Sequence, residues 1–167
     1  MSGSTSHPDR WWPLVAAIAA AASVLAASLL GNFATMPNIA PWYETLAKPP
    51  LTPPNWLFGP AWTTLYILMA YAFFRVLRLK PATPGRRAAI LTFFAQLVLN
   101  AAWSFAFFSA RSPLLGLVVI LPMEALLIAT IVLFYRLDRV AGYALAPTVF
   151  WVGFAIYLNA GILVLNS

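Results

Sequence analysis

The segment Pro113–Tyr135, with the sequence PLLGLVVILPMEALLIATIVLFY, decides the fold class of this chain. Glu124 is its only acidic or basic residue, and nearly every other position is apolar. A helix needs about 20 mostly apolar residues to cross a hydrocarbon core of roughly 30 Å. Because lipid offers no hydrogen bonds, such a segment has to satisfy its own peptide groups as a helix. We therefore predict a transmembrane helix here.

Four further segments have the same character, namely Pro13–Ala34, Trp56–Phe74, Ala88–Ala110 and Ala141–Leu165. Of the 167 residues, 62% are hydrophobic and 8% are charged, whereas soluble proteins average about 25% charged residues. The sequence predicts an all-α integral membrane protein, a five-transmembrane-helix bundle. It forms a single domain at residues 13–167 after a polar tail at residues 1–12. The first span is longer than the roughly 7–15-residue core of a signal peptide, so we expect it to be retained.

The basic residues are distributed unevenly between the two ends of the predicted bundle. Only Lys48 and Arg111 fall on the side of the loop that follows the first span. The other eight are Arg10, Arg75, Arg78, Lys80, Arg86, Arg87, Arg136 and Arg139. Cytoplasmic loops are enriched in Lys and Arg, so we expect the N-terminus inside and the C-terminus outside, with a bacterial cytoplasmic membrane favoured. The eight cations would face anionic lipid headgroups. Without a soluble basic domain, we expect no nucleic-acid partner.

The segment Thr35–Asn55, between the first two spans, is rich in proline. It contains Pro37, Pro41, Pro49, Pro50, Pro53 and Pro54. Proline cannot continue a helix interior, and it pushes the preceding residue to extended geometry. We therefore predict a structured extramembrane loop. Loops of this length are usually functional lids or binding loops, so we expect a proline-rich lid over one end of the bundle.

Polar side chains within the predicted spans recur at helical spacing beside aromatic residues. In the third span Gln96, Asn100 and Ser104 are four residues apart and share one face. Comparable sets are Trp103 and Phe107 in the third span, Trp62, Tyr66 and Met69 in the second, and Trp151, Ala155 and Asn159 in the fifth. Turned inward, these faces would line an aromatic cavity with few hydrogen-bonding groups, which suits a flat apolar ligand. The alternative is that the amides only bond neighbouring helices. We favour that for Gln96 and leave the choice open for Asn100.

Small residues form a stripe on the first span, at Ala19, Ser23, Ala27 and Gly31. Such stripes allow helices to approach closely in lipid. The stripe indicates a packing or dimer seam, although an alanine-rich helix also yields such stripes by chance.

Reactive side chains are scarce in this sequence. Glu124 is the only acid within a span, and we expect it to be protonated or paired. A role in proton relay is the less favoured alternative. The chain has no cysteine, and its one histidine, His7, lies in the polar tail. We find no metal-ligand cluster, nucleophile–base pair or phosphate-binding loop in the sequence, so we expect no metal and no required cofactor.

Three segments, in this order, resemble one protein family. The loop and second span read WYETLAKPPLTPPNWLFGPAWTTLY from Trp42 to Tyr66. The third span contains NAAWSFAFF from Asn100, and the fifth contains PTVFWVGFAIYLN from Pro147. Together they closely resemble the TspO/MBR family, the tryptophan-rich sensory or translocator proteins. The resemblance runs from about Gly31 to the C-terminal end.

The resemblance implies a five-helix bundle, commonly a homodimer, that binds porphyrins and other flat apolar ligands beneath the loop. Trp62, Asn100 and Trp151 match the family's cavity residues, and Trp42 matches its loop tryptophan. The full set of predicted ligand-binding residues is Trp42, Trp62, Tyr66, Asn100, Trp103, Phe107, Trp151 and Ala155. The propionates of a porphyrin are expected to pair with Lys48 or Arg111, because charge-assisted hydrogen bonds are the strong ones.

The leading interpretation is therefore a membrane receptor or sensor for porphyrins that regulates tetrapyrrole or stress responses. Two alternatives stay open, a light-dependent porphyrin-degrading enzyme that uses Trp62 and a transporter of porphyrins or sterol-like ligands. The chain also departs from the family pattern. Leu51 stands where an aromatic residue is common, and the acidic position of the fourth span falls at Val119 rather than Glu124. The animal sterol motif is missing its Tyr and Arg, so we do not expect sterol recognition there.

Overall fold

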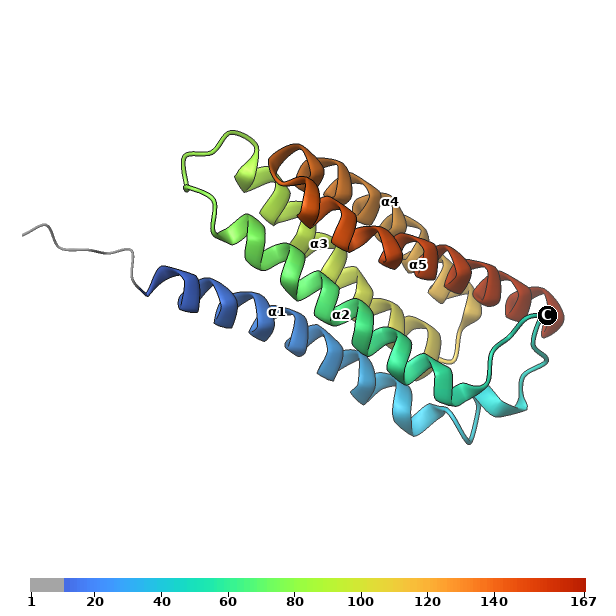
Figure 1. Ribbon diagram of the computed structural model, residues 1–167. Helices are drawn as coiled ribbons and strands as arrows, with labels where there is room; N and C mark the ends of the chain where they lie inside the picture. The colour runs from blue at the N-terminus through green and yellow to red at the C-terminus, as the bar shows by residue number, and fades with distance from the viewer. Residues whose placement is uncertain (1–10) are drawn as a thin grey trace, which may run out of the picture.

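The computed structural model describes residues 11–167, which form five long helices joined by one long loop, between the first two, and by shorter connections (Figure 1). The helices are α1 (Trp12–Thr35), α2 (Asn55–Leu77), α3 (Arg86–Ser104), α4 (Pro113–Leu137) and α5 (Arg139–Leu165). Short turns are η1 (Met36–Asn38), η2 (Tyr43–Thr45) and the π-helical η3 (Phe105–Ser109), which continues α3. All five helices are long and apolar enough to cross a membrane, which confirms the predicted spans to within a few residues at each end. The tail at residues 1–10, including His7, lies outside the described residues.

The five helices lie roughly side by side (Figure 1). α1 packs against α2 and α3, and α2 also packs against α5. α4 lies between α3 and α5 and completes the ring. Because every helix has two neighbours and an outer face, each can bury one stripe and present apolar side chains to lipid.

The end of the bundle away from the proline-rich loop is solidly packed. Phe93 stacks on Phe73 with ring centroids 4.3 Å apart and on Phe134 at 5.7 Å. Small side chains around these rings, such as Ala20 and Ala141, let the helices approach closely. This core anchors the helices whose opposite ends diverge around the cavity described below.

The stripe of small residues predicted on α1 is only partly an internal seam. Ala27 and Gly31 are buried, whereas Ala19 is exposed and Ser23 is half-buried. The inner face of α1 is set by Ala16, Ala20, Val24, Ala27, Gly31 and Ala34. Within one chain, therefore, only the second half of the predicted stripe lies on the inner face, and a dimer seam along its exposed first half stays a prediction.

Basic residues gather at the packed end, as their sequence positions required. Arg75 near the end of α2 forms a 2.8 Å ion pair with Asp138, the residue between α4 and α5. The Asp138 side chain also accepts a hydrogen bond from the backbone N–H of Ala141 and so caps α5. Arg86 donates to the carbonyl oxygens of Val76 and Leu77 and thereby satisfies the end of α2. Which side of the membrane this end faces stays a prediction.

The loop between α1 and α2 covers the other end of the bundle and is bound to the last turns of α5 (Figure 1). The Asn166 side chain accepts a hydrogen bond from the N–H of Ala47 and donates one to its carbonyl oxygen. The Tyr157 hydroxyl donates to the carbonyl oxygen of Pro50 at 2.9 Å. The prolines therefore belong to an ordered cover, as predicted.

Candidate ligand cavity

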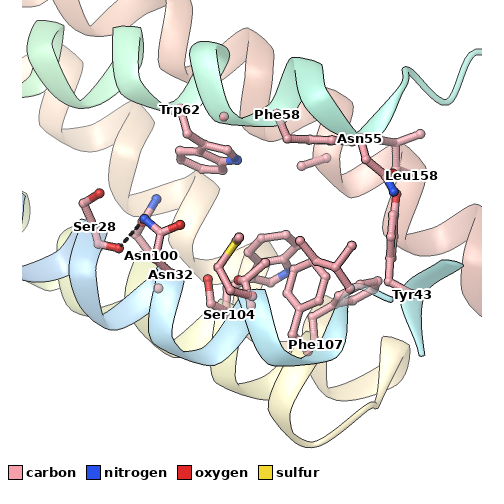
Figure 2. Close-up of a pocket in the computed structure, with 18 of the residues that line it drawn as sticks. Ser28, Asn32, Tyr43, Asn55, Phe58, Trp62, Asn100, Ser104, Phe107 and Leu158 are labelled. Carbon is pink, nitrogen blue, oxygen red and sulfur yellow. Dashed lines mark hydrogen bonds between the residues drawn. The ribbon is translucent and has the colours of Figure 1, made fainter. Parts of the chain in front are cut away.

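A cavity of about 480 Å³ lies directly beneath the loop, enclosed by α1, α2, α3, η3 and α5 (Figure 2). Its lining includes Ser28, Gly31, Asn32, Thr35, Met36, Ile39, Tyr43, Asn55, Trp56, Phe58, Gly59, Trp62, Thr63, Tyr66, Asn100, Trp103, Ser104, Phe107, Phe108, Trp151, Ala155, Leu158, Asn159 and Ile162. Seven of the eight predicted ligand-binding residues are in this set. None of the lining residues is acidic or basic.

Aromatic rings form two opposing walls of the cavity. On the α2 side, Trp62 lies 5.5 Å from Tyr66 between ring centroids, with an interplanar angle of 31°. On the α3 side, Trp103 stacks on Phe107 at 5.5 Å and 22°. Figure 2 shows Trp62 across the open space from Phe107. The arrangement provides flat apolar surfaces for a planar ligand.

The amide of Asn100 is the most informative polar group in the cavity. Its Oδ1 accepts a 2.7 Å hydrogen bond from the Tyr66 hydroxyl, which joins α3 to α2. Its Nδ2 has no hydrogen-bond partner in the described part of the chain, so a donor is left toward the cavity. Asn100 is therefore compatible with both predicted roles. Its Oδ1 bonds a neighbouring helix, and its Nδ2 is free to donate to a ligand.

The other amides of the predicted polar faces are occupied. Asn159 accepts a hydrogen bond from the Trp103 indole N–H at 3.2 Å and donates to the Pro113 carbonyl oxygen at 2.7 Å. Gln96 is buried, and its amide nitrogen donates to the sulfur of Met69 across the α2–α3 contact. Gln96 thus lies between helices, where we favoured it.

Two features of the cavity wall were missed by the sequence reasoning. The first is η3, whose π-helical turn brings both Phe107 and Phe108 to the interior; such turns occur often at functional sites. The second is Gly116 on α4, where an added β-carbon would lie 2.5 Å from Oδ1 of Asn159 and 2.9 Å from the Phe107 ring. Because Gly116 has no side chain, Asn159 and Phe107 can occupy the space beside it. The sequence around Gly116 is a run of apolar residues and contains no pattern that indicates this contact.

Trp42 lies behind the cavity wall and is not part of the lining. Its ring is 5.3 Å from Phe107 and 6.4 Å from Phe108 in edge-on geometry. Tyr43 does line the cavity, and burial raises the pKa of its phenol above the ordinary value. The loop therefore contributes Tyr43 to the wall and uses Trp42 to support the phenylalanines.

The two predicted propionate partners lie outside the lining and are engaged with the loop. The Lys48 ammonium donates to the carbonyl oxygens of Glu44 and Leu46, both at 3.2 Å. The Arg111 guanidinium donates to the Asn38 side chain at 3.3 Å. The Lys48 ammonium also lies over the ring of the lining residue Tyr43, 4.8 Å from its centroid. Because neither Lys48 nor Arg111 is itself a lining residue, pairing with a ligand carboxylate would occur at the cavity's margin. That pairing stays a prediction.

Glu124 is separate from the cavity. It lies on α4 beside α5, and a β-carbon added at Gly153 would be 3.9 Å from its Oε1. Its Oε2 is buried without a hydrogen-bond partner among the described residues. Across residues 11–167, no group of three potential ligand side chains could hold a metal ion.

Comparison with known proteins places these features in a family context. The TspO/MBR family description matches residues 18–165 of the chain. The tryptophan-rich protein TspO of Archaeoglobus fulgidus is 41% identical over 150 residues, which cover 90% of this chain and 96% of that protein. The tryptophan-rich sensory protein of Cereibacter sphaeroides is 37% identical and covers 75% of this chain and 77% of its own length. The translocator protein of Homo sapiens is 36% identical, with coverage of 71% and 70%.

Proposed function

This chain belongs to the TspO/MBR family of membrane proteins, and from that premise we propose that it is a receptor for porphyrins and other flat apolar ligands. The proposal rests above all on the cavity beneath the loop, with its opposed aromatic walls and the free amide donor of Asn100. Its volume of about 480 Å³ lies in the range of about 300–1,000 Å³ that is typical of small-molecule sites.

A planar ring would lie between the Trp62 wall and the Trp103–Phe107 wall. Burial of its faces supplies most of the binding free energy, since transfer of apolar surface out of water is favourable. The Nδ2 of Asn100 would donate to a nitrogen or oxygen at the ligand's edge and fix its orientation. A carboxylate inside the cavity would meet no cation, so charged substituents are expected to stay at the margin, where Lys48 and Arg111 lie outside the lining.

Receptor or sensor action is favoured over transport. The described chain contains one ion pair, between Arg75 on α2 and Asp138 at the α4–α5 junction, at the packed end and away from the cavity. No charged pair that could couple ligand movement to an ion lines the site. The regulation of tetrapyrrole or stress responses and the homodimer stay predictions, as does insertion in the cytoplasmic membrane with the N-terminus inside.

Titration of the full-length protein in lipid nanodiscs with protoporphyrin IX, in the dark, tests the proposal. Tryptophan fluorescence should be quenched on binding. Trp62→Ala and Trp151→Ala should each weaken binding by about tenfold, which corresponds to about 1.4 kcal/mol. Trp12→Ala is the matched control, since Trp12 lies at the packed end and outside the lining. Unchanged affinity in both cavity variants would refute the site assignment.

The same samples under light separate binding from catalysis. A receptor should release the porphyrin chemically unchanged after illumination in oxygen. A new absorbing product that forms with the wild type, and does not form with Trp62→Phe, would instead establish the light-dependent enzyme.

A further inference from the structure

Among the described residues, the exposed part of the cavity lining lies on one side, along α1, η1 and α2. Six of its lining residues are exposed, namely Asn32, Met36, Asn55, Trp56, Gly59 and Thr63. All six belong to α1, η1 or the first turns of α2. Every lining residue from the loop, α3, η3 and α5 is buried or half-buried. The exposed set therefore marks a slot between α1 and α2, at the end nearer the loop.

The end of the bundle beneath the loop is closed by specific contacts. Asn166 forms two hydrogen bonds with Ala47. Pro49 is buried against α5, where a β-carbon added at Gly161 would lie 2.6 Å from its ring. On the α3 side, the Ser109 hydroxyl donates to the Ala34 carbonyl oxygen at 3.3 Å. A ligand that entered from above would have to break several of these contacts.

The slot itself lacks such closure. Gly59 faces it without a side chain, and a β-carbon there would meet nothing within 4 Å. Thr63 bonds only within its own helix, to the carbonyl oxygen of Gly59. Farther from the loop, α1 and α2 close on each other through buried residues such as Val24 and Met69. The gap is therefore confined to the depth of the cavity.

The rim of the slot is polar on a surface that otherwise faces lipid. Asn32 donates to the Ser28 carbonyl oxygen at 3.0 Å, visible as the dashed line in Figure 2, and its own Oδ1 has no partner within residues 11–167. Exposed amides and hydroxyls are costly against hydrocarbon. Their position on both sides of the opening is explained if polar groups of a ligand pass or rest there.

We propose that the slot between α1 and α2 is a lateral entrance, through which a flat ligand dissolved in the bilayer moves sideways into the cavity. This inference rests on the proposed ligand-binding function and adds its route. An apolar ring concentrates in the membrane, so entry in the plane of the bilayer avoids transfer through water. The ring's apolar body follows the gap above Gly59, while its polar edge contacts Asn32 and Thr63.

The test compares ligand exchange rates in variants that narrow the slot. Thr63→Phe and Asn32→Phe each add a ring at the rim, one from α2 and one from α1. Ile67→Phe is the matched control, since Ile67 is exposed one turn farther along α2 and does not line the cavity. Protein in nanodiscs is mixed with vesicles that contain protoporphyrin IX, and its release into empty vesicles is then followed by porphyrin fluorescence.

Both rim variants should slow association and dissociation by about tenfold, because a narrowed entrance raises the barrier in both directions. Asn32 and Thr63 also line the cavity, so the deciding result is the slower dissociation rather than a constant Kd. Ile67→Phe should keep wild-type rates. Unchanged rates in both rim variants would overturn the entrance, and so would slower association accompanied by an equal loss of affinity. If the wild type does not bind protoporphyrin at all, both the proposed function and the proposed entrance are wrong. Binding with unaltered exchange would refute only the entrance.

Discussion

The Tyr66 hydroxyl on α2 donates a 2.7 Å hydrogen bond to Oδ1 of Asn100 on α3, and this contact leaves Nδ2 of the amide as the free donor of the cavity. One lone pair of Oδ1 is occupied by this bond, whereas both N–H groups of Nδ2 stay available to the cavity. An acceptor at the edge of the ligand is therefore favoured over a donor. One bond thus joins two helices and orients the amide that we propose contacts the ligand.

Tyr66→Phe should separate these two effects. Loss of the hydrogen bond is expected to destabilise the protein by about 1 kcal/mol, and the freed amide can rotate, so affinity for protoporphyrin should fall several-fold. Tyr157→Phe is the control, because it also removes a bonded hydroxyl, to Pro50, at a site outside the cavity. Thermal unfolding in detergent and the dark titration measure the two quantities. Equal affinity losses in both variants would contradict a specific role for Tyr66.

Gly116→Ala should damage the cavity wall from behind. The new methyl group would lie 2.5 Å from Oδ1 of Asn159 and 2.9 Å from the Phe107 ring, so both side chains have to move. Overpacking of this kind typically costs about 1–3 kcal/mol. Ligand affinity should fall as well, since Phe107 is part of the stacked pair with Trp103.

Gly153→Ala is the natural comparison for Gly116→Ala. A β-carbon at Gly153 meets nothing closer than 3.9 Å, at Glu124, and alanine favours a helix over glycine. This variant should be as stable as the wild type or more so, with unchanged ligand affinity. A stability loss equal to that of Gly116→Ala would show that the cost arises from the backbone and not from the wall.

Sequence alone predicted the spans and the polar faces well, because both follow from length and helical periodicity. Asn100 and Ser104 are buried on the face that their spacing required. The π-helical turn at Phe105–Ser109 was not predictable, since one extra residue per turn leaves no mark in an apolar sequence. The turn contains Phe107 and Phe108, and both side chains are buried in the interior.

Long-range contacts set the other limit of prediction. Trp42 was expected to contact the ligand, yet it packs behind Phe107, because the path of the loop depends on its attachment to α5 through Asn166. The helical periodicity of a sequence also does not indicate where two neighbouring helices, such as α1 and α2, separate from each other. The slot at Asn32 and Thr63 therefore became visible only once α1 and α2 were placed side by side.

The α4–α5 junction should make stability depend on pH through Asp138. Burial alone would raise the pKa of Asp138, but the Arg75 guanidinium and the Ala141 N–H outweigh it and lower that pKa from its ordinary value. A lowered folded-state pKa contributes stability that is present above the unfolded value of about 4 and is lost as the pH falls through the folded value. Because the pair is partly exposed, we expect less than about 1 kcal/mol.

Asp138→Asn measures this contribution. The stability difference between wild type and variant should be constant from about pH 6 to 8 and should shrink below about pH 4, as the carboxylate takes up its proton. Unfolding in mixed detergent micelles gives both curves. A difference that grows on acidification would contradict the assignment.

Asn166→Ala tests whether the loop is a fixed cover. The change removes both hydrogen bonds to Ala47, and each such bond is worth about 0.5–1.5 kcal/mol. Hydrogen exchange at the backbone amides of the non-proline residues between 46 and 52 should therefore accelerate. Ligand exchange should stay at the wild-type rate, because the route lies between α1 and α2. Ser167→Ala, at the neighbouring terminal position, should leave both measurements unchanged. Faster ligand exchange in Asn166→Ala would instead identify the loop as a gate.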